Sequence, residues 1–229
     1  MIKVAKTKIN LLINKLPWIT TYSSFSLNYK KSPFEEAYLE RVKNNIFLGL
    51  CISDHPSKLG DFAWQNIRGD SYLQNSIFGE NSRLKNKHEE IWKFYQGWYV
   101  TDIIKGDKEI DYLWEKSSGN KGMFQRAKFI KKNLTPEIKQ KCLEYFETER
   151  KILQPSIVVL FGDDAWYVLK EALNIREPQV KFLELPHRNL EYFIYENTTF
   201  YHARHYRQGW IRQLYGDLIG IFNKNNKTD

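Results

Sequence analysis

The sequence predicts an α/β protein: a three-layer α/β/α architecture with a central, mostly parallel sheet. Two observations predict this class. Apolar runs rich in β-branched or aromatic residues are typical of buried strands, and they occur at residues 45–52, 97–104, 155–162 and 180–185. Helical patterns separate these runs, and such alternation is typical of parallel sheets that helices cover on both faces.

The clearest helix signal spans residues 135–153. Thr135 is a suitable N-cap because its hydroxyl can accept a hydrogen bond from a first-turn N–H, and Pro136 suits the first turn. An amphipathic pattern near the start of the chain stops at Pro17, which predicts another helix. We expect residues 1–229 to form a single domain in which residues 1–44 are an N-terminal helical extension.

A hairpin and a helix are predicted for the C-terminal part. Aromatic runs on both sides of Glu196 and Asn197 predict the hairpin, whose second strand leads to His202. Residues 207–222 have the pattern of an amphipathic helix, and the polar tail at 223–229 is expected to fray. In an open parallel sheet the reactive groups follow the carboxyl ends of the strands. The segments to inspect are therefore residues 51–56, 101–105, 162–164 and 202–204.

The composition favours an acidic partner. The chain has 35 Lys and Arg against 27 Asp and Glu, a net charge of +8, and many of its aromatic residues adjoin a basic one. Base stacking with phosphate contact would explain this pattern, and so would a solvated lysine surface around an ordinary core.

Cys51 and Cys142 form neither a disulfide framework nor a four-ligand metal site, and the N-terminal apolar run is too short for a signal peptide or membrane span. We expect a cytoplasmic monomer that binds DNA and no membrane, and that uses no cofactor or metal.

Segments along residues 45–222 resemble, in their order, the uracil-DNA glycosylase superfamily, most closely its iron–sulfur branch. "NIFLGLCISDHPSKLGDF" is similar to the strand, Gly-containing first motif and Gly-x-Pro-Phe of the family, and "WYVTDIIKG" to its Thr-Asn-x-x-Lys-Cys. "CLEYFETERKILQPSIVVLFGDDAWYVL" resembles its helix, strand, Leu-Gly and following helix, and "PHRNLEYFIYENTTFYHAR" its His-Arg-Gly, hairpin and terminal His-Pro-Ser. The resemblance implies the α/β/α fold and a mechanism in which the target nucleotide flips out of the helix into a pocket.

The resemblance implies that His202 is the catalytic histidine. It falls on the terminal motif at a strand end, where an N–H donor would stabilise the negative charge on the carbonyl oxygen of the departing base. His187 falls on the motif before the hairpin, so that with Arg188 it would brace the site or contact the DNA backbone. A structural histidine at a strand end is the alternative for His202.

The first motif departs from the family. The family has an acid or Asn just after its Gly, where this chain has Leu50 and Cys51, and the nearest carboxylate is Asp54. We expect Cys51 to line the base pocket and Asp54 to activate water or stabilise positive charge on the sugar, with a helix N-cap as the alternative for Asp54. Cys142 is the one counterpart of the cluster cysteines of the branch, so the resemblance carries no iron–sulfur cluster over to this chain.

Asp102 stands where the family has the Asn that reads the base edge. An ionised Asp only accepts hydrogen bonds, which favours the exocyclic amine of cytosine over O4 of uracil. Because release of ordinary cytosine would damage the genome of the cell, we expect a modified base, such as the glucosylated hydroxymethylcytosine of phage DNA. Phe62 matches the family's stacking Phe. The alternatives are an Asp that caps a turn and a Phe in the core.

Arg204, His205 and Arg207 follow the terminal motif, where the family inserts a loop into the DNA groove. Arg204 replaces a small hydroxyl residue and can hold a phosphate through its planar guanidinium, although a solvated basic face is the alternative. The sequence thus predicts a monofunctional DNA glycosylase that leaves an abasic site and acts in defence against phages. A uracil-type repair glycosylase and a non-catalytic DNA-binding relative remain as alternatives.

Overall fold

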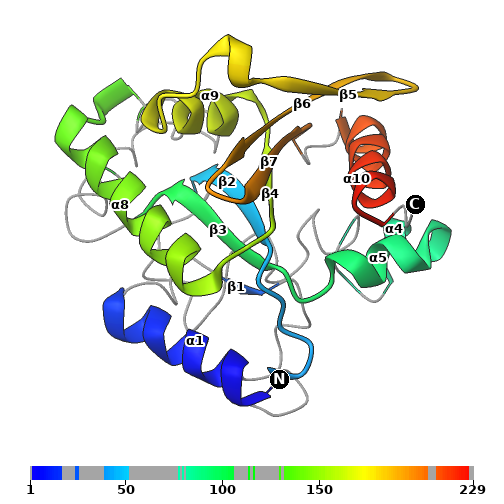
Figure 1. Cartoon of the computed structure of the whole chain (residues 1–229), viewed down its shortest axis with the longest axis horizontal. Coiled ribbons are helices and arrows are strands. Elements are labelled where there is room, and N and C mark those ends of the chain that lie inside the picture. Colours follow the sequence, from blue (N-terminus) through cyan, green and yellow to red (C-terminus); the bar gives the residue numbers. More distant parts are fainter. Residues whose placement is uncertain are drawn as a thin grey trace.

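The computed structural model describes residues 2–16, 24–25, 39–51, 77, 79, 81–105, 113, 116, 129, 132–205 and 210–226. These residues form a mixed sheet with helices on both of its faces (Figure 1). The predicted α/β class with a mostly parallel sheet is thereby confirmed. In these ranges none of the helices combines the length and the apolar character that a membrane crossing needs.

The described strands are arranged in the order β1-β3-β2-β4-β7-β6-β5. The central strands β3, β2, β4 and β7 run parallel, while β1 and the pair β6 and β5 are antiparallel to their neighbours. β3 and β4 are buried along their whole length, as expected for strands that helices cover on both faces. The strands are β1 (Ser24–Phe25), β2 (Ile46–Cys51), β3 (Tyr99–Ile104), β4 (Ile157–Phe161), β5 (Lys181–Leu185), β6 (Arg188–Tyr195) and β7 (Thr198–Ala203).

Successive residues of the central strands point to two different hydrophobic clusters, because side chains alternate along a strand. Phe47 and Phe161 face a cluster with α4, α5 and α10, which we call the α10 face of the sheet. Leu48 and Leu160 face a cluster with α1, α8 and α9, which we call the α9 face. The N-terminal helix α1 is therefore part of the hydrophobic core. The helices are α1 (Ile2–Lys15), α4 (Arg83–Lys87), α5 (Glu89–Tyr95), α8 (Pro136–Leu153), α9 (Asp163–Ala172) and α10 (Ile211–Asn226).

The strand predicted at residues 180–185 exists, but it is not the buried strand that we expected. β5 lies at the edge of the sheet, where its described partner is the antiparallel strand β6. Lys181, Phe182 and Glu184 are exposed, and two of the three are charged, which is typical of an edge strand. The prediction was wrong because the position of a strand within a sheet depends on distant pairing, which a local apolar run does not contain.

Two local predictions are confirmed. β6 and β7 form an antiparallel hairpin, and its turn residues Glu196 and Asn197 have φ angles of 42° and 64°. Positive φ at both positions is the geometry of a tight hairpin turn, and Asn tolerates it well. Thr135 caps α8, and its Oγ1 accepts a hydrogen bond of 3.3 Å from the N–H of Ile138.

The tail prediction was wrong in part, because α10 extends to Asn226. Asn225 donates a hydrogen bond of 3.2 Å to the hydroxyl of Tyr201, and Lys224 Nζ lies 4.1 Å from the ring centroid of Tyr192. These contacts with β7 and β6 hold the exposed polar residues at the end of α10 in the helix.

A buried ion pair joins β3 to α8. Lys105 and Glu149 are in contact, and both side chains are 0% exposed. The Thr101 hydroxyl donates to Glu149 at 3.0 Å and accepts from Lys105 Nζ at 2.7 Å. Burial lowers the pKa of Lys105, and the Glu149 carboxylate opposes this shift. The carboxyl end of β3, which carries Asp102, is thereby fixed against α8.

We expect Thr135→Ala to lower the free energy of unfolding by about 1 kcal/mol, because an N–H of the first turn of α8 loses its acceptor. Urea denaturation measures the change. Thr148→Ala is the matched control, because the Thr148 hydroxyl donates to the Glu144 carbonyl within the same helix and Ala favours helix. Equal losses in the two variants would contradict a capping role.

Candidate functional site

The parallel register places His202 level with Thr101 of β3. Thr101 pairs with Leu48, Leu48 with Leu160, and Leu160 with His202, so the row crosses β3, β2, β4 and β7. These side chains point to the α9 face, as the cluster around Leu48 and Leu160 shows. Asp102 is one residue further along β3 and therefore points to the α10 face. The structure thus places His202 and Asp102 on opposite faces, with two strands between them.

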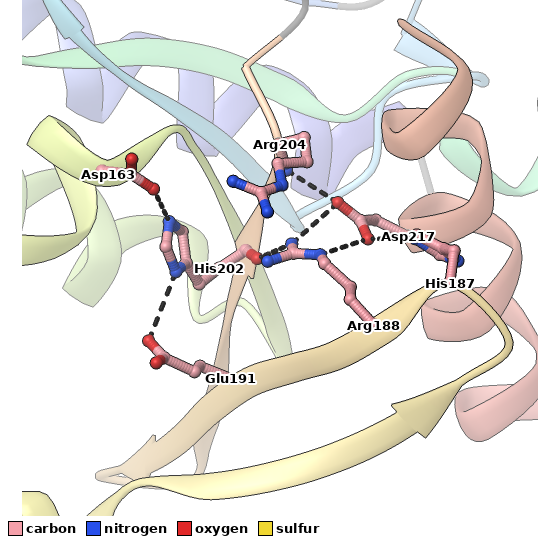
Figure 2. A network of polar contacts seen from close by, with 7 residues as sticks. All are labelled: Asp163, His187, Arg188, Glu191, His202, Arg204 and Asp217. Carbon is pink, nitrogen blue, oxygen red and sulfur yellow. Dashed lines mark hydrogen bonds and ion pairs between the residues drawn. The ribbon is translucent and has the colours of Figure 1, made fainter. Parts of the chain in front are cut away.

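His202 lies in a buried niche between β6, β7 and α9. Its imidazole stacks on Trp166, with ring centroids 5.0 Å apart and an interplanar angle of 7°, and its side chain is 7% exposed. Nδ1 is 3.3 Å from Glu191 Oε2, and Nε2 is 3.0 Å from Asp163 Oδ1 (Figure 2). Glu191 belongs to β6, whereas Asp163 is the first residue of α9. We call these four side chains the His202 niche.

The charges around His202 act in opposite directions. Burial lowers the pKa of His202 below its usual value of 6.5, and the Arg188 guanidinium lowers it further. The carboxylates of Glu191 and Asp163 oppose this shift without reversing it. The imidazole is therefore neutral at neutral pH and has a single N–H.

A second network surrounds the fully buried carboxylate of Asp217 on α10. It accepts hydrogen bonds from Arg188 Nε at 2.9 Å, from an Arg188 terminal nitrogen at 2.8 Å and from the backbone N–H of Arg204 at 2.7 Å. His187 Nε2 is 2.9 Å from the same carboxylate. Arg188 also donates to the backbone carbonyl of His202 at 2.6 Å, so this network and the niche meet at that residue (Figure 2).

Two glycines have places in these networks that a larger residue would disturb. A Cβ at Gly216 would lie 2.4 Å from Cε1 of His187, so a side chain there would push the imidazole away from α10. Gly162 has φ of 84°, which favours glycine, and its N–H donates to the Ala203 carbonyl at 2.9 Å. This bond ties the end of β4 to the end of β7, and Gly162 is also the N-cap of α9, which begins at Asp163 beside His202.

The structure brings together only some of the predicted site residues. Arg188 donates to the carbonyl of His202 near the end of β7, and His187 contacts Asp217 of α10, whereas their role in a site stays a prediction. The guanidinium of Arg204 packs 4.9 Å from the ring centroid of Trp210, and His205 lies against Gly162. The backbone of Cys51 ends β2, but its side chain is not among the described ones. Asp54, Phe62 and Arg207 lie outside the described residues.

Three acids of the site were missed by sequence reasoning. Asp163 lies in a segment that we inspected as a strand end, yet no motif singled it out. Glu191 and Asp217 are single acids in an aromatic strand and an amphipathic helix, where an acid normally faces solvent. Only the pairing of β6 with β7 and the packing of α10 reveal their partners. Within the described ranges, no group of three or more His, Cys, Asp or Glu side chains is placed to hold a metal ion.

We expect Asp217→Asn to lower the free energy of unfolding by about 3 kcal/mol, because the partly buried Arg188 guanidinium then lacks a charged partner. Urea denaturation at neutral pH measures the loss. Glu171→Gln, the same acid-to-amide change at an exposed position of α9, is the control. A loss no larger than that of the control would show that Asp217 does not hold the network.

The pH dependence of stability tests the protonation state of His202. Because its pKa is lower in the folded protein than its usual 6.5, the stability that depends on the neutral imidazole is fully present above pH 6.5. This stability is lost as the pH falls through the pKa that His202 has in the folded protein, with a slope of at most about 1.4 kcal/mol per pH unit. We expect the difference in unfolding free energy between the unmodified protein and His202→Gln to decrease on acidification. A difference that grows on acidification would contradict the direction of the shift.

No protein-family model matches the chain, and no curated protein matches its sequence. A function must therefore be inferred from the side chains described above and from the motifs in the sequence.

Proposed function

We propose that the protein is a monofunctional DNA glycosylase that flips a modified, cytosine-derived base out of DNA and hydrolyses its N-glycosidic bond. The His202 niche carries the proposal. A buried imidazole near the carboxyl end of a parallel strand, between two carboxylates, is a typical arrangement for proton transfer. Reactive groups of open α/β sheets lie at this edge. The resemblance of this strand end to the terminal motif of the uracil-DNA glycosylase superfamily supports the same assignment.

DNA as the substrate is supported by charge. The chain has a net charge of +8, and Arg204 and His205 directly follow the strand that carries His202. Arg204 is partly exposed although its Nε is buried, so the terminal nitrogens of its guanidinium would be the atoms that bind a phosphate while its backbone N–H stays bound to Asp217. A flipped nucleotide presents a phosphate close to its glycosidic bond, so a cation next to the reacting imidazole suits this substrate.

Asp102 remains our candidate for base choice. It is 1% exposed and lies opposite Gly49 on β2. Asp102 and His202 point to opposite faces of the sheet. Both could contact the same nucleotide only if this nucleotide extended around the edge of the sheet at which the parallel strands end. The role of Asp102 in base choice can therefore be tested separately from that of His202 in the chemistry. Defence against phages that modify their cytosines is the biological role that fits a preference for such a base.

A non-catalytic DNA-binding relative is the second candidate. The observation that favours it is the burial of the His202 side chain, which is 7% exposed and stacked on Trp166. In that function His202 would hold β7 against α9, and the basic residues beyond the strand would bind phosphate. The two candidates differ in whether any base is released.

The deciding experiment measures base release from single- and double-stranded oligonucleotides, read as strand breaks after alkali. The substrates contain uracil, 5-methylcytosine, 5-hydroxymethylcytosine or its glucosylated form. We expect release of a modified cytosine, and a loss in rate of at least about 10²-fold in His202→Ala, since the proton transfer is lost. His88→Ala, at an exposed histidine next to α5, is the matched control. Asp102→Asn should shift the preference towards uracil, because the amide adds a donor.

The contrary outcomes are distinct. Uracil release that Asp102→Asn leaves unchanged would favour a uracil-type repair glycosylase. Salt-sensitive DNA binding without release from any substrate would identify a binding protein. Release that is unchanged in His202→Ala would place the chemistry elsewhere in the chain.

A further inference from the structure

The two ring nitrogens of His202 have different surroundings. Nδ1 forms a hydrogen bond of 3.3 Å with Glu191 Oε2. Nε2 is 3.0 Å from Asp163 Oδ1, but the carboxylate lies away from the direction in which an N–H at Nε2 would point. Nε2 is thus buried and has no hydrogen-bond partner among the described residues.

This difference selects one tautomer of the neutral ring. A neutral imidazole donates from one nitrogen and accepts at the other. The carboxylate of Glu191 can only accept when it is ionised, so the proton belongs on Nδ1 and the lone pair on Nε2. Carboxylates that hold one nitrogen of a catalytic histidine commonly set the tautomer in this way.

Within the function proposed above, on which this step rests, we infer that His202 accepts a proton at Nε2 and that Glu191 is the positioning residue that reserves Nε2 for this task. The direction is opposite to the one that the motif led us to expect, in which His202 donates to the departing base. The geometry also supplies a candidate for water activation among the described residues, a role that we had assigned to Asp54.

The charged groups around the ring fit an acceptor. Burial, and after it the charge of Arg188 on β6, disfavours a positive charge on the ring, which keeps Nε2 free of a proton before the reaction. Asp163 on α9, the acid beside Nε2, has a side chain that is 65% exposed, and proton transfer from water requires this side chain to turn so that water reaches Nε2. After proton transfer, the carboxylates of Asp163 and Glu191 stabilise the imidazolium.

The reaction is balanced without a further reactant. A water gives one proton to Nε2 while its oxygen forms a bond to C1′ of the sugar. The bond from C1′ to the base nitrogen breaks, and its electron pair leaves with the base. The imidazolium then returns the proton to the departed base, so that His202 is neutral again.

The tautomer can be tested in the DNA-free protein with two-bond ¹H–¹⁵N correlation spectra of the histidine rings. We expect His202 to carry its proton on Nδ1. In Glu191→Met the acceptor at Nδ1 is gone while the shape is nearly kept, so the proton should move to Nε2, beside Asp163. Glu191→Asp should retain part of the Nδ1–H form, and Glu184→Met at an exposed position of β5 should leave the spectrum unchanged. An Nε2–H tautomer in the unmodified protein, or no change in Glu191→Met, would overturn the inference.

Base release gives a second readout. If Nε2 is the acceptor, the rate rises with pH through the pKa of His202, and Glu191→Met loses on the order of 10²-fold in rate. A rate that falls as pH rises through this pKa would show that His202 is a donor and would overturn the inference, although the glycosylase function would stand. An Nδ1–H tautomer together with no base release would overturn the proposed function, while the role of Glu191 in holding Nδ1 would stand.

Discussion

The buried carboxylate of Asp217 is the contact on which the arrangement of the site depends. Its two oxygens accept two hydrogen bonds from Arg188 and one from the backbone N–H of Arg204, and they also contact His187. These four contacts occupy the four acceptor positions of a carboxylate. α10, β6 and the end of β7 are thereby joined at one point. Because Arg188 also holds the carbonyl of His202, the position of the imidazole follows from that of Asp217. The backbone of His202 is thus held by Arg188, while Trp166, Glu191 and Asp163 contact its ring.

A second buried charge pair, Lys105 with Glu149, fixes the end of β3, the other strand end of the candidate site. Buried ion pairs contribute little net stability compared with apolar residues of the same size, because both charges lose their water. They do define one geometry, since any other arrangement leaves a charge unpaired. The two networks hold the carboxyl ends of β3 and β7, where the motifs placed Asp102 and His202. Rigid support at these points suits a site whose groups must be placed accurately.

The sequence predicted those features that one or two residues determine. Thr135 caps its helix, and Glu196 and Asn197 turn the hairpin, because each depends on local backbone geometry. Features set by distant pairing were missed. The position of β5 at the edge follows from the pairing of β6 with β7. In the same way, Glu191 is a partner of His202 only because these two strands are neighbours.

The face of the sheet on which a residue lies also decides how base recognition can work. Asp102 and His202 are separated by three strand spacings, about 14 Å, which is more than the width of a base. Their side chains also point to opposite faces of the sheet. A nucleotide that places its glycosidic bond at the His202 niche would first meet the carboxylates of the niche itself. Asp163 is an acceptor-only group when ionised, as Asp102 is, and its side chain is 65% exposed. In the proposed function, Asp163 would therefore offer an acceptor to the amine of a cytosine next to the imidazole, and base choice would not depend on Asp102 alone.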